Sequence, residues 1–206
     1  DDFYFYPGWD SSFLREIKRL THNLFYFSGI MIEKDTVNGI YGSNIKDFNE
    51  KKLLSEHESL IFEDFQGSTW APHLIHKNIW EKIGGFSEEF YPGTGSDPDL
   101  NKKLWDIGVR IFKGIGKAKV YHFGSIVTRK YNKDKYNITE SGNKGAKIFL
   151  LKWGITIKFF KKYYLKSDTK YLGPLSDPDK NIAYFIELLK CKLSYIYLIF
   201  LKKLNF

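Results

Sequence analysis

The spacing of apolar and polar residues divides this chain into alternating helices and strands. Residues 24–32 form an almost unbroken apolar run with aromatic and β-branched residues, which is typical of a buried strand. Helices are expected over 11–20, within 50–60, and over 75–83, 97–107, 146–165 and 180–203. Strands are expected within 62–70, over 109–112 and over 119–123, and polar residues predict loops over the rest of 33–60 and over 126–145.

Residue type marks the start of the helix at 97–107. Asp97 is predicted to be its N-cap and Pro98 its first helical residue. A carboxylate there meets unpaired N–H groups and the positive end of the helix dipole, which favours the ionised form. Asp97 is therefore a candidate general base toward a hydroxyl group, with an ordinary helix start as the alternative. Asp99 is expected to complement the dipole or fix the loop, and we group it with the substrate-binding candidates.

The composition indicates a folded chain without disulfides. Its 206 residues suffice for one domain with an extension, and 43% hydrophobic and 18% aromatic content argues against disorder. The single cysteine, Cys191, excludes an internal disulfide and a zinc site built from cysteines. These features fit a reducing compartment, so we predict a cytoplasmic location, with the inner face of the membrane as a peripheral site.

Charge separates the two parts of the chain. Residues 1–125 carry 15 Lys+Arg against 18 Asp+Glu, whereas residues 126–206 carry 17 against 6. The basic part favours anionic partners such as phospholipid, nucleotide or nucleic acid. No RRM, KH or helix-turn-helix signature is present, and the lysines interleave with a hydrophobic helix, so we predict no nucleic-acid partner.

Other acids and histidines are candidate ligands. Asp1 and Asp2 are adjacent carboxylates suited to Mg²⁺ or Mn²⁺, with an exposed turn as the alternative. His122 ends an apolar strand and is either a ligand to metal or phosphate or a structural residue. His73 and His76 have no carboxylate that completes a zinc motif, so we interpret them as structural or as residues near an acceptor.

Several segments together resemble one known family. In order, they are Asp1-Asp2, Pro7-Gly8-Trp9-Asp10, Ala71-Pro72-His73-Leu74-Ile75, Trp80-Glu81-Lys82-Ile83-Gly84-Gly85-Phe86, Gly95-Ser96-Asp97-Pro98-Asp99-Leu100 and Val120-Tyr121-His122-Phe123. Residues 1–130 resemble the C-terminal part of a family 2 glycosyltransferase of the GT-A type. The resemblance implies an α/β fold, that is, part of a Rossmann-like nucleotide-diphospho-sugar transferase domain, followed by a mainly helical, basic extension over 131–206.

The resemblance also implies roles for individual residues. Asp2 and Asp1 match the metal-binding acids of the family, and His122 matches a histidine that some members place near metal or diphosphate. Asp97 matches the catalytic base, although Ser96 replaces the acid that usually precedes it. Two further segments are implied around the sugar and acceptor, namely Trp9-Asp10 and Trp70.

The implied activity is transfer of a sugar from a nucleotide-sugar donor to a glycan or a lipid-linked acceptor, with inversion and a divalent metal. The metal would stabilise the leaving diphosphate while Asp97 accepts the acceptor proton. The alternative is an inactive module that binds glycan or membrane. Because the family's nucleotide-binding units precede Asp1-Asp2 and are absent here, we expect a fragment that binds nucleotide-sugar weakly.

The C-terminal helix suggests a membrane contact. Residues 184–201 are strongly apolar and aromatic, with lysines within and after them. The longest uncharged stretch is too short to span a bilayer, but such a helix is suited to the interface of an anionic membrane. Packing of the helix on the domain is the alternative.

Overall fold

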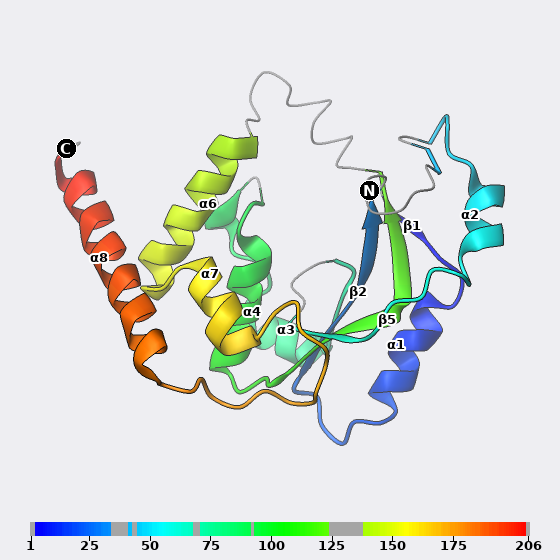
Figure 1. Ribbon diagram of the computed structural model, residues 1–206, viewed down its shortest axis with the longest axis horizontal. Helices are drawn as coiled ribbons and strands as arrows, with labels where there is room; N and C mark the ends of the chain where they lie inside the picture. The colour runs from blue at the N-terminus through cyan, green and yellow to red at the C-terminus, as the bar shows by residue number, and fades with distance from the viewer. Residues whose placement is uncertain are drawn as a thin grey trace.

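The computed structural model describes residues 3–33, 41–42, 45–67, 71–91, 93–123 and 138–204, with the backbone alone given for 138–142 and 202–204. It is a mixed α/β structure in which a sheet lies beside a group of helices (Figure 1). The strands are β1 (Phe3–Phe5), β2 (Phe25–Glu33), β3 (Phe65–Gln66), β4 (His73–Ile75) and β5 (Ile111–His122). The helices are α1 (Trp9–Ile17), α2 (Glu50–Glu56), α3 (Lys77–Ile83), η1 (Glu88–Phe90), α4 (Ser96–Asp106), α6 (Ile138–Trp153), α7 (Ile157–Phe159), η2 (Phe160–Leu165) and α8 (Ile182–Leu204).

The sheet is mixed and has the order β1-β5-β2-β4, with β3 pairing to β5 outside this path. The two longest strands, β2 and β5, run parallel, and the other pairs are antiparallel. The buried strand expected over 24–32 is confirmed as β2. The mixed sheet supports the α/β class.

Alternate side chains of β2 point to opposite faces of the sheet, and each face packs against different helices. Phe25 and Phe27 pack with Phe13 of α1. Tyr26 faces the other way and belongs to the largest core, which also contains Leu100 and Leu104 of α4 and residues of α6, α7 and α8. The sheet therefore separates α1 from α4.

Strand β5 corrects the prediction of two strands over 109–112 and 119–123. It is continuous because two glycines allow close neighbours in its middle. A Cβ on Gly116 would lie 2.0 Å from the carbonyl oxygen of Phe62, and one on Gly114 would lie 2.2 Å from the ring of Phe65. Such approaches exclude any side chain, so these positions keep the strand intact while the preceding segment crosses it.

The helix predicted over 146–165 is also corrected, because it is interrupted. Gly154 has a φ of 68° and ends α6, and the hydroxyl of Thr156 accepts a hydrogen bond from the Phe159 backbone N–H at 3.1 Å to start α7. Helix α6 begins at Ile138, so the loop predicted over 126–145 is wrong from that residue on. The rest of that prediction lies outside the described residues.

Helix α8 packs along α6 and α7 through one side only. Tyr184 and Cys191 are buried on that side, and the Cys191 thiol lies 3.7 Å from the Thr156 hydroxyl. Within the described ranges, no helix combines the length and the apolar character needed to cross a bilayer.

Candidate active site

A chain of polar side chains joins the sheet to the start of α4. The Tyr26 hydroxyl on β2 is hydrogen-bonded to Nδ1 of His73 on β4. The other ring nitrogen, Nε2, lies 3.3 Å from Oδ1 of Asp97. Tyr26 is completely buried, whereas the Asp97 side chain is 34% exposed. This series of polar side chains therefore begins in the core and ends on a carboxylate that solvent can reach.

The environment of Tyr26 fixes the direction of its hydrogen bond to His73. Burial, reinforced by the charge of Asp97, raises the pKa of the Tyr26 phenol well above its usual value, so it stays protonated at neutral pH. Asn101, one turn after Asp97 on α4, donates to the phenol oxygen. The phenol proton is then directed to Nδ1 of His73, and a neutral imidazole carries its own proton on Nε2, facing Asp97.

The start of α4 differs from the sequence prediction. Asp97 was predicted to be the N-cap, but the helix begins at Ser96 with Gly95 at the N-cap position. Gly95 has a φ of 93°, and the Ser96 hydroxyl donates to the Gly93 carbonyl at 2.6 Å, which turns the chain into the helix earlier. Asp97 still lies in the first turn, near the positive end of the helix dipole.

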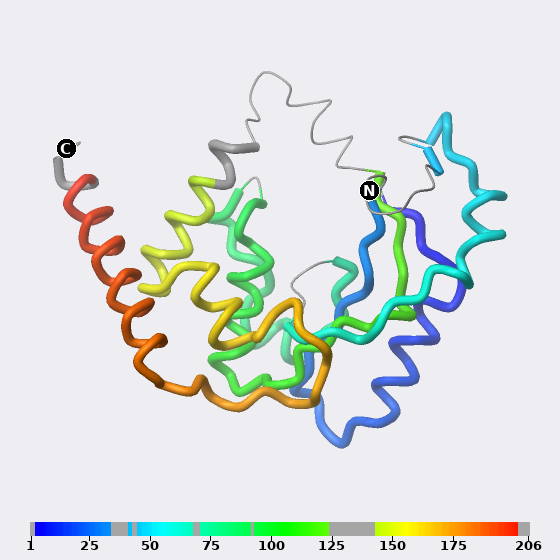
Figure 2. The backbone as a smooth tube through the Cα atoms, in the orientation of Figure 1, coloured from blue at the N-terminus to red at the C-terminus, as the bar shows by residue number. Residues whose placement is uncertain are grey.

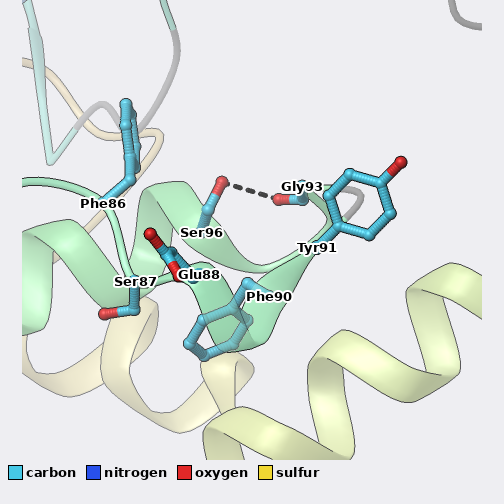
Figure 3. Close-up of a pocket in the computed structure, with 7 residues that line it drawn as sticks. All are labelled: Phe86, Ser87, Glu88, Phe90, Tyr91, Gly93 and Ser96. Atoms are coloured by element: carbon cyan, nitrogen blue, oxygen red, sulfur yellow. Dashed lines mark hydrogen bonds between the residues drawn. The ribbon is translucent and has the colours of Figure 1, made fainter.

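A cavity of about 540 Å³ lies at the start of α4 (Figure 3). Its walls come from the segment before α4 and the first residue of that helix: Phe86, Ser87, Glu88, Phe90, Tyr91, Gly93 and Ser96. In Figure 3, Phe86 and Tyr91 project on either side of Ser96. The Phe86 ring also contacts the His73 ring edge-on, with centroids 6.0 Å apart, so cavity and polar chain share a wall.

Asp99 performs a different task from Asp97. Its side chain is wholly buried and accepts hydrogen bonds from the Trp153 indole N–H at 2.8 Å and from the Ser87 hydroxyl at 2.7 Å. Lys152 lies 3.0 Å from the same carboxylate. Burial lowers the pKa of Lys152, but hydrogen bonds to Glu89 and Asp99 outweigh this effect and raise it. Asp99 thus binds protein groups of α6 and of the segment that forms the cavity.

His122 lies in a second polar group at the far end of β2. Its Nδ1 is 2.8 Å from Oε1 of Glu33, the last residue of β2, and its ring contacts that of Phe3. Tyr26 lies seven residues earlier on β2, so the two polar groups are anchored about 20 Å apart along that strand.

The residues predicted to bind a metal are only partly described by the structure. Asp1 and Asp2 lie outside the described residues, although Asp2 directly precedes Phe3, which pairs with His122. Among the described residues, no group of three or more histidine, cysteine or acidic side chains is placed to hold a metal ion. His122 and Glu33 are compatible with a divalent ion but do not by themselves form such a group, so no chemical step is derived from it.

The remaining predicted residues do not join Asp97. Trp9 belongs to α1 on the other side of the sheet, where its ring packs on Phe5 at 4.4 Å. Asp10 is exposed and accepts a hydrogen bond from the Ser11 backbone N–H at 2.7 Å. Trp70 lies outside the described residues.

Sequence reasoning did not identify Tyr26, and it gave His73 no specific role. The available signal was a tyrosine between two phenylalanines in a strand, where alternation sends its hydroxyl to the opposite face. Comparison of the chain with models of known families, with curated proteins and with solved structures finds no match.

Proposed function

We propose that the protein is a glycosyltransferase in which Asp97 is the general base. The observation that carries this proposal is the series of polar side chains Tyr26–His73–Asp97. It ends on a partly exposed carboxylate, and its His73 ring contacts Phe86, which lines a cavity with aromatic walls. The volume of about 540 Å³ suits a small ligand such as a sugar unit. Phe86 and Tyr91, which are 43% and 77% exposed, offer apolar ring faces to such a ligand.

The chemistry follows from the orientation of Asp97. Nε2 of His73 lies 3.3 Å from Oδ1, and in this proposal Oδ2 accepts the proton of an acceptor hydroxyl. As that proton moves, the acceptor oxygen forms a bond to the anomeric carbon of the donor sugar. The bond from this carbon to the phosphate oxygen breaks, and the nucleoside diphosphate leaves with the electron pair. A single displacement of this kind inverts the anomeric centre and needs no nucleophile from the protein.

The finer fold assignment belongs to the same proposal. We assign residues 1–130 to the C-terminal part of a GT-A domain and residues 131–206 to its extension. The parallel pair β2–β5 and the acid at the start of α4 support this assignment. The residues proposed to hold a Mg²⁺ or Mn²⁺ ion are Asp2, Asp1 and His122, where the ion would supply Lewis-acid chemistry. Because His122 lies about 20 Å along β2 from the group that contacts Asp97, the displacement above is not routed through this ion.

The decisive experiment is a transfer assay on the full chain. A panel of UDP-, GDP- and dTDP-hexoses is supplied with Mn²⁺ and a mixture of oligosaccharide and polyprenyl-phosphate acceptors, and released nucleoside diphosphate is measured. We expect Asp97→Asn to lower turnover by about 10²- to 10⁴-fold, the usual contribution of a general base. Asp106→Asn, an exposed acid at the other end of α4, is the matched control and should stay within twofold of the unmodified chain.

Two outcomes would contradict the proposal. Unchanged turnover in Asp97→Asn would remove Asp97 from the base role. Absence of turnover with every donor, combined with retained glycan binding by both proteins in calorimetry, would instead support an inactive glycan-binding module. The observation that favours this second candidate is that Asp99 accepts hydrogen bonds from Ser87 and Trp153. These bonds occupy an acid near α4 that could otherwise take part in catalysis.

A further inference from the structure

Helix α8 carries an apolar surface that no described element covers. We call it the outer stripe, and its members are the large apolar residues of α8 that are at least half exposed: Ile182, Phe185, Ile186, Leu189, Leu193, Ile196, Tyr197 and Phe200. They recur at helical spacing on the side opposite Tyr184 and Cys191, which face the core. From Ile182 to Phe200 the stripe is about 27 Å long. Figure 2 shows α8 at the outer edge of the molecule.

Lysines border this stripe on both sides. At 100° per residue, Lys190 lies along one border of the stripe and Lys192 along the other, and no acidic residue falls within it. The nearest carboxylate is Glu187, which is paired with Lys190 at 2.9 Å. A lysine with its stem on an apolar surface and its ammonium at the border has the geometry that interfacial helices use.

Further lysines adjoin one border. The hydrogen bond from Lys190 and the charges of Lys162 and Lys158 lower the pKa of Glu187, so these lysines lie near that side of α8. They also line a cavity of about 800 Å³ formed by α7, η2 and the residues after them. Its walls hold four lysines and one aspartate: Lys158, Lys161, Lys162, Lys166 and Asp168. The cavity is suited to lipid phosphates.

The charge distribution indicates which partner binds to the outer stripe. Residues 153–206 contain ten lysines and four acidic residues. A second copy seated on the stripe would bring two lysine borders together, which is unfavourable. An anionic bilayer accepts the apolar side chains and supplies phosphates to the lysines at the same time.

We propose that the outer stripe of α8 docks on the surface of an anionic membrane, with the lysines of the neighbouring cavity binding the lipid headgroups. The helix lies in the plane of the interface and keeps its inner side on α6 and α7. This inference does not depend on the transferase proposal.

The test measures co-sedimentation of the full chain with vesicles at low salt. We expect binding to vesicles of phosphatidylcholine with 30% phosphatidylglycerol, at least tenfold weaker binding to phosphatidylcholine alone, and weakening at 0.5 M salt. Leu189→Gln with Leu193→Gln should weaken binding at least tenfold. The matched control is Leu14→Gln with Ile61→Gln, two exposed apolar residues elsewhere, and it should bind like the unmodified chain. Far-UV circular dichroism verifies that each variant is folded.

A second variant tests the charges. Lys158→Gln with Lys162→Gln should weaken binding by at least fivefold while leaving the stripe intact. The proposal is overturned if the chain ignores anionic vesicles at low salt or binds neutral vesicles equally well. It is also overturned if sedimentation without vesicles shows a dimer that Leu189→Gln with Leu193→Gln dissociates.

Discussion

Asp97 and Asp99 lie two residues apart in the first turn of α4, yet their carboxylates face different surroundings. The Asp97 side chain is 34% exposed and lies against His73, whereas the Asp99 side chain has no exposure and binds groups of α6 and of the segment before α4. Two residues correspond to about 200° around a helix, so one turn supplies both a solvent-accessible acid and a buried anchor. Through its contacts, Asp99 holds in place the helical turn that exposes Asp97.

Tyr26→Phe tests whether the buried hydroxyl positions Asp97. The substitution keeps the ring in the core and removes the donor to Nδ1 of His73. We expect kcat for transfer to fall about 10- to 100-fold with KM within twofold, because Asp97 loses its orientation while its charge remains. Nitrogen NMR of His73 should show the proton on Nε2 in the unmodified chain and a mixture of tautomers in the variant.

The matched control for that variant is Tyr163→Phe, which removes a buried hydroxyl that has no hydrogen-bond partner among the described residues. It should leave both kcat and the His73 spectrum unchanged. A spectrum of the unmodified chain dominated by a proton on Nδ1 would exclude the proposed direction of the hydrogen bonds, whether or not transfer is detected.

Asp99→Asn should destabilise the fold. Removing this charge breaks the ion pair between the buried Asp99 carboxylate and Lys152, whose side chain is 27% exposed and also pairs with Glu89. We expect the free energy of unfolding, measured with urea, to fall by about 1–2 kcal/mol. Asp106→Asn, at the exposed end of an i,i+4 pair with Lys102 on the same helix, should cost less than about 0.5 kcal/mol. Equal effects of the two variants would show that Asp99 is not an anchor.

Stability should decrease in alkaline solution because buried tyrosines keep their protons. Burial raises the pKa of Tyr6 and of Tyr26 above their ordinary value of 10.0. Above pH 10 the unfolded chain loses these protons and the folded chain retains them. The free energy of unfolding therefore falls as pH rises, by at most about 1.4 kcal/mol per pH unit for each group.

Tyr6→Phe isolates one of these contributions. The Tyr6 hydroxyl has no hydrogen-bond partner among the described residues, so its removal leaves no partner unsatisfied. Urea unfolding between pH 8 and 9 should give parallel curves for the variant and the unmodified chain. Between pH 10 and 11 the variant should lose less stability, and an identical loss would contradict a raised pKa for Tyr6.

Local sequence signals predicted most of the elements but few of the contacts between them. Gly84 ends α3 with a φ of 70°, as its position after the helix predicted. The Tyr26–His73 bond joins residues 47 apart in the chain, and it depends on the pairing of β2 with β4, which periodicity does not reveal. The local signal placed Asp97 in the first turn of a helix but misplaced the N-cap, which is Gly95, and its role as a base stays a prediction. The partners of Asp97 had no local signal, because they are set by the topology of the sheet.

The continuity of β5 shows the same distinction. The sequence predicted two strands, over 109–112 and 119–123, and the segment between them contains Gly114 and Gly116, a residue type that is a poor strand former. In the folded chain they admit a crossing segment, and β5 continues through them although its pairing with β2 changes register between Gly114 and Lys119. One strand and two strands can be distinguished only in the folded structure, where the Phe62 carbonyl lies against Gly116.

Because Cys191 is buried, the reactivity of its thiol reports whether α8 is packed on its neighbours. It is the single thiol of the chain, and it lies on the inner side of α8 against Thr156. A reagent that alkylates thiols reaches it only when the helix lifts from its neighbours. The rate of alkylation therefore distinguishes two modes of membrane binding. The rate stays low if α8 remains packed on α6 and α7, and it rises if α8 separates from them and inserts into the lipid.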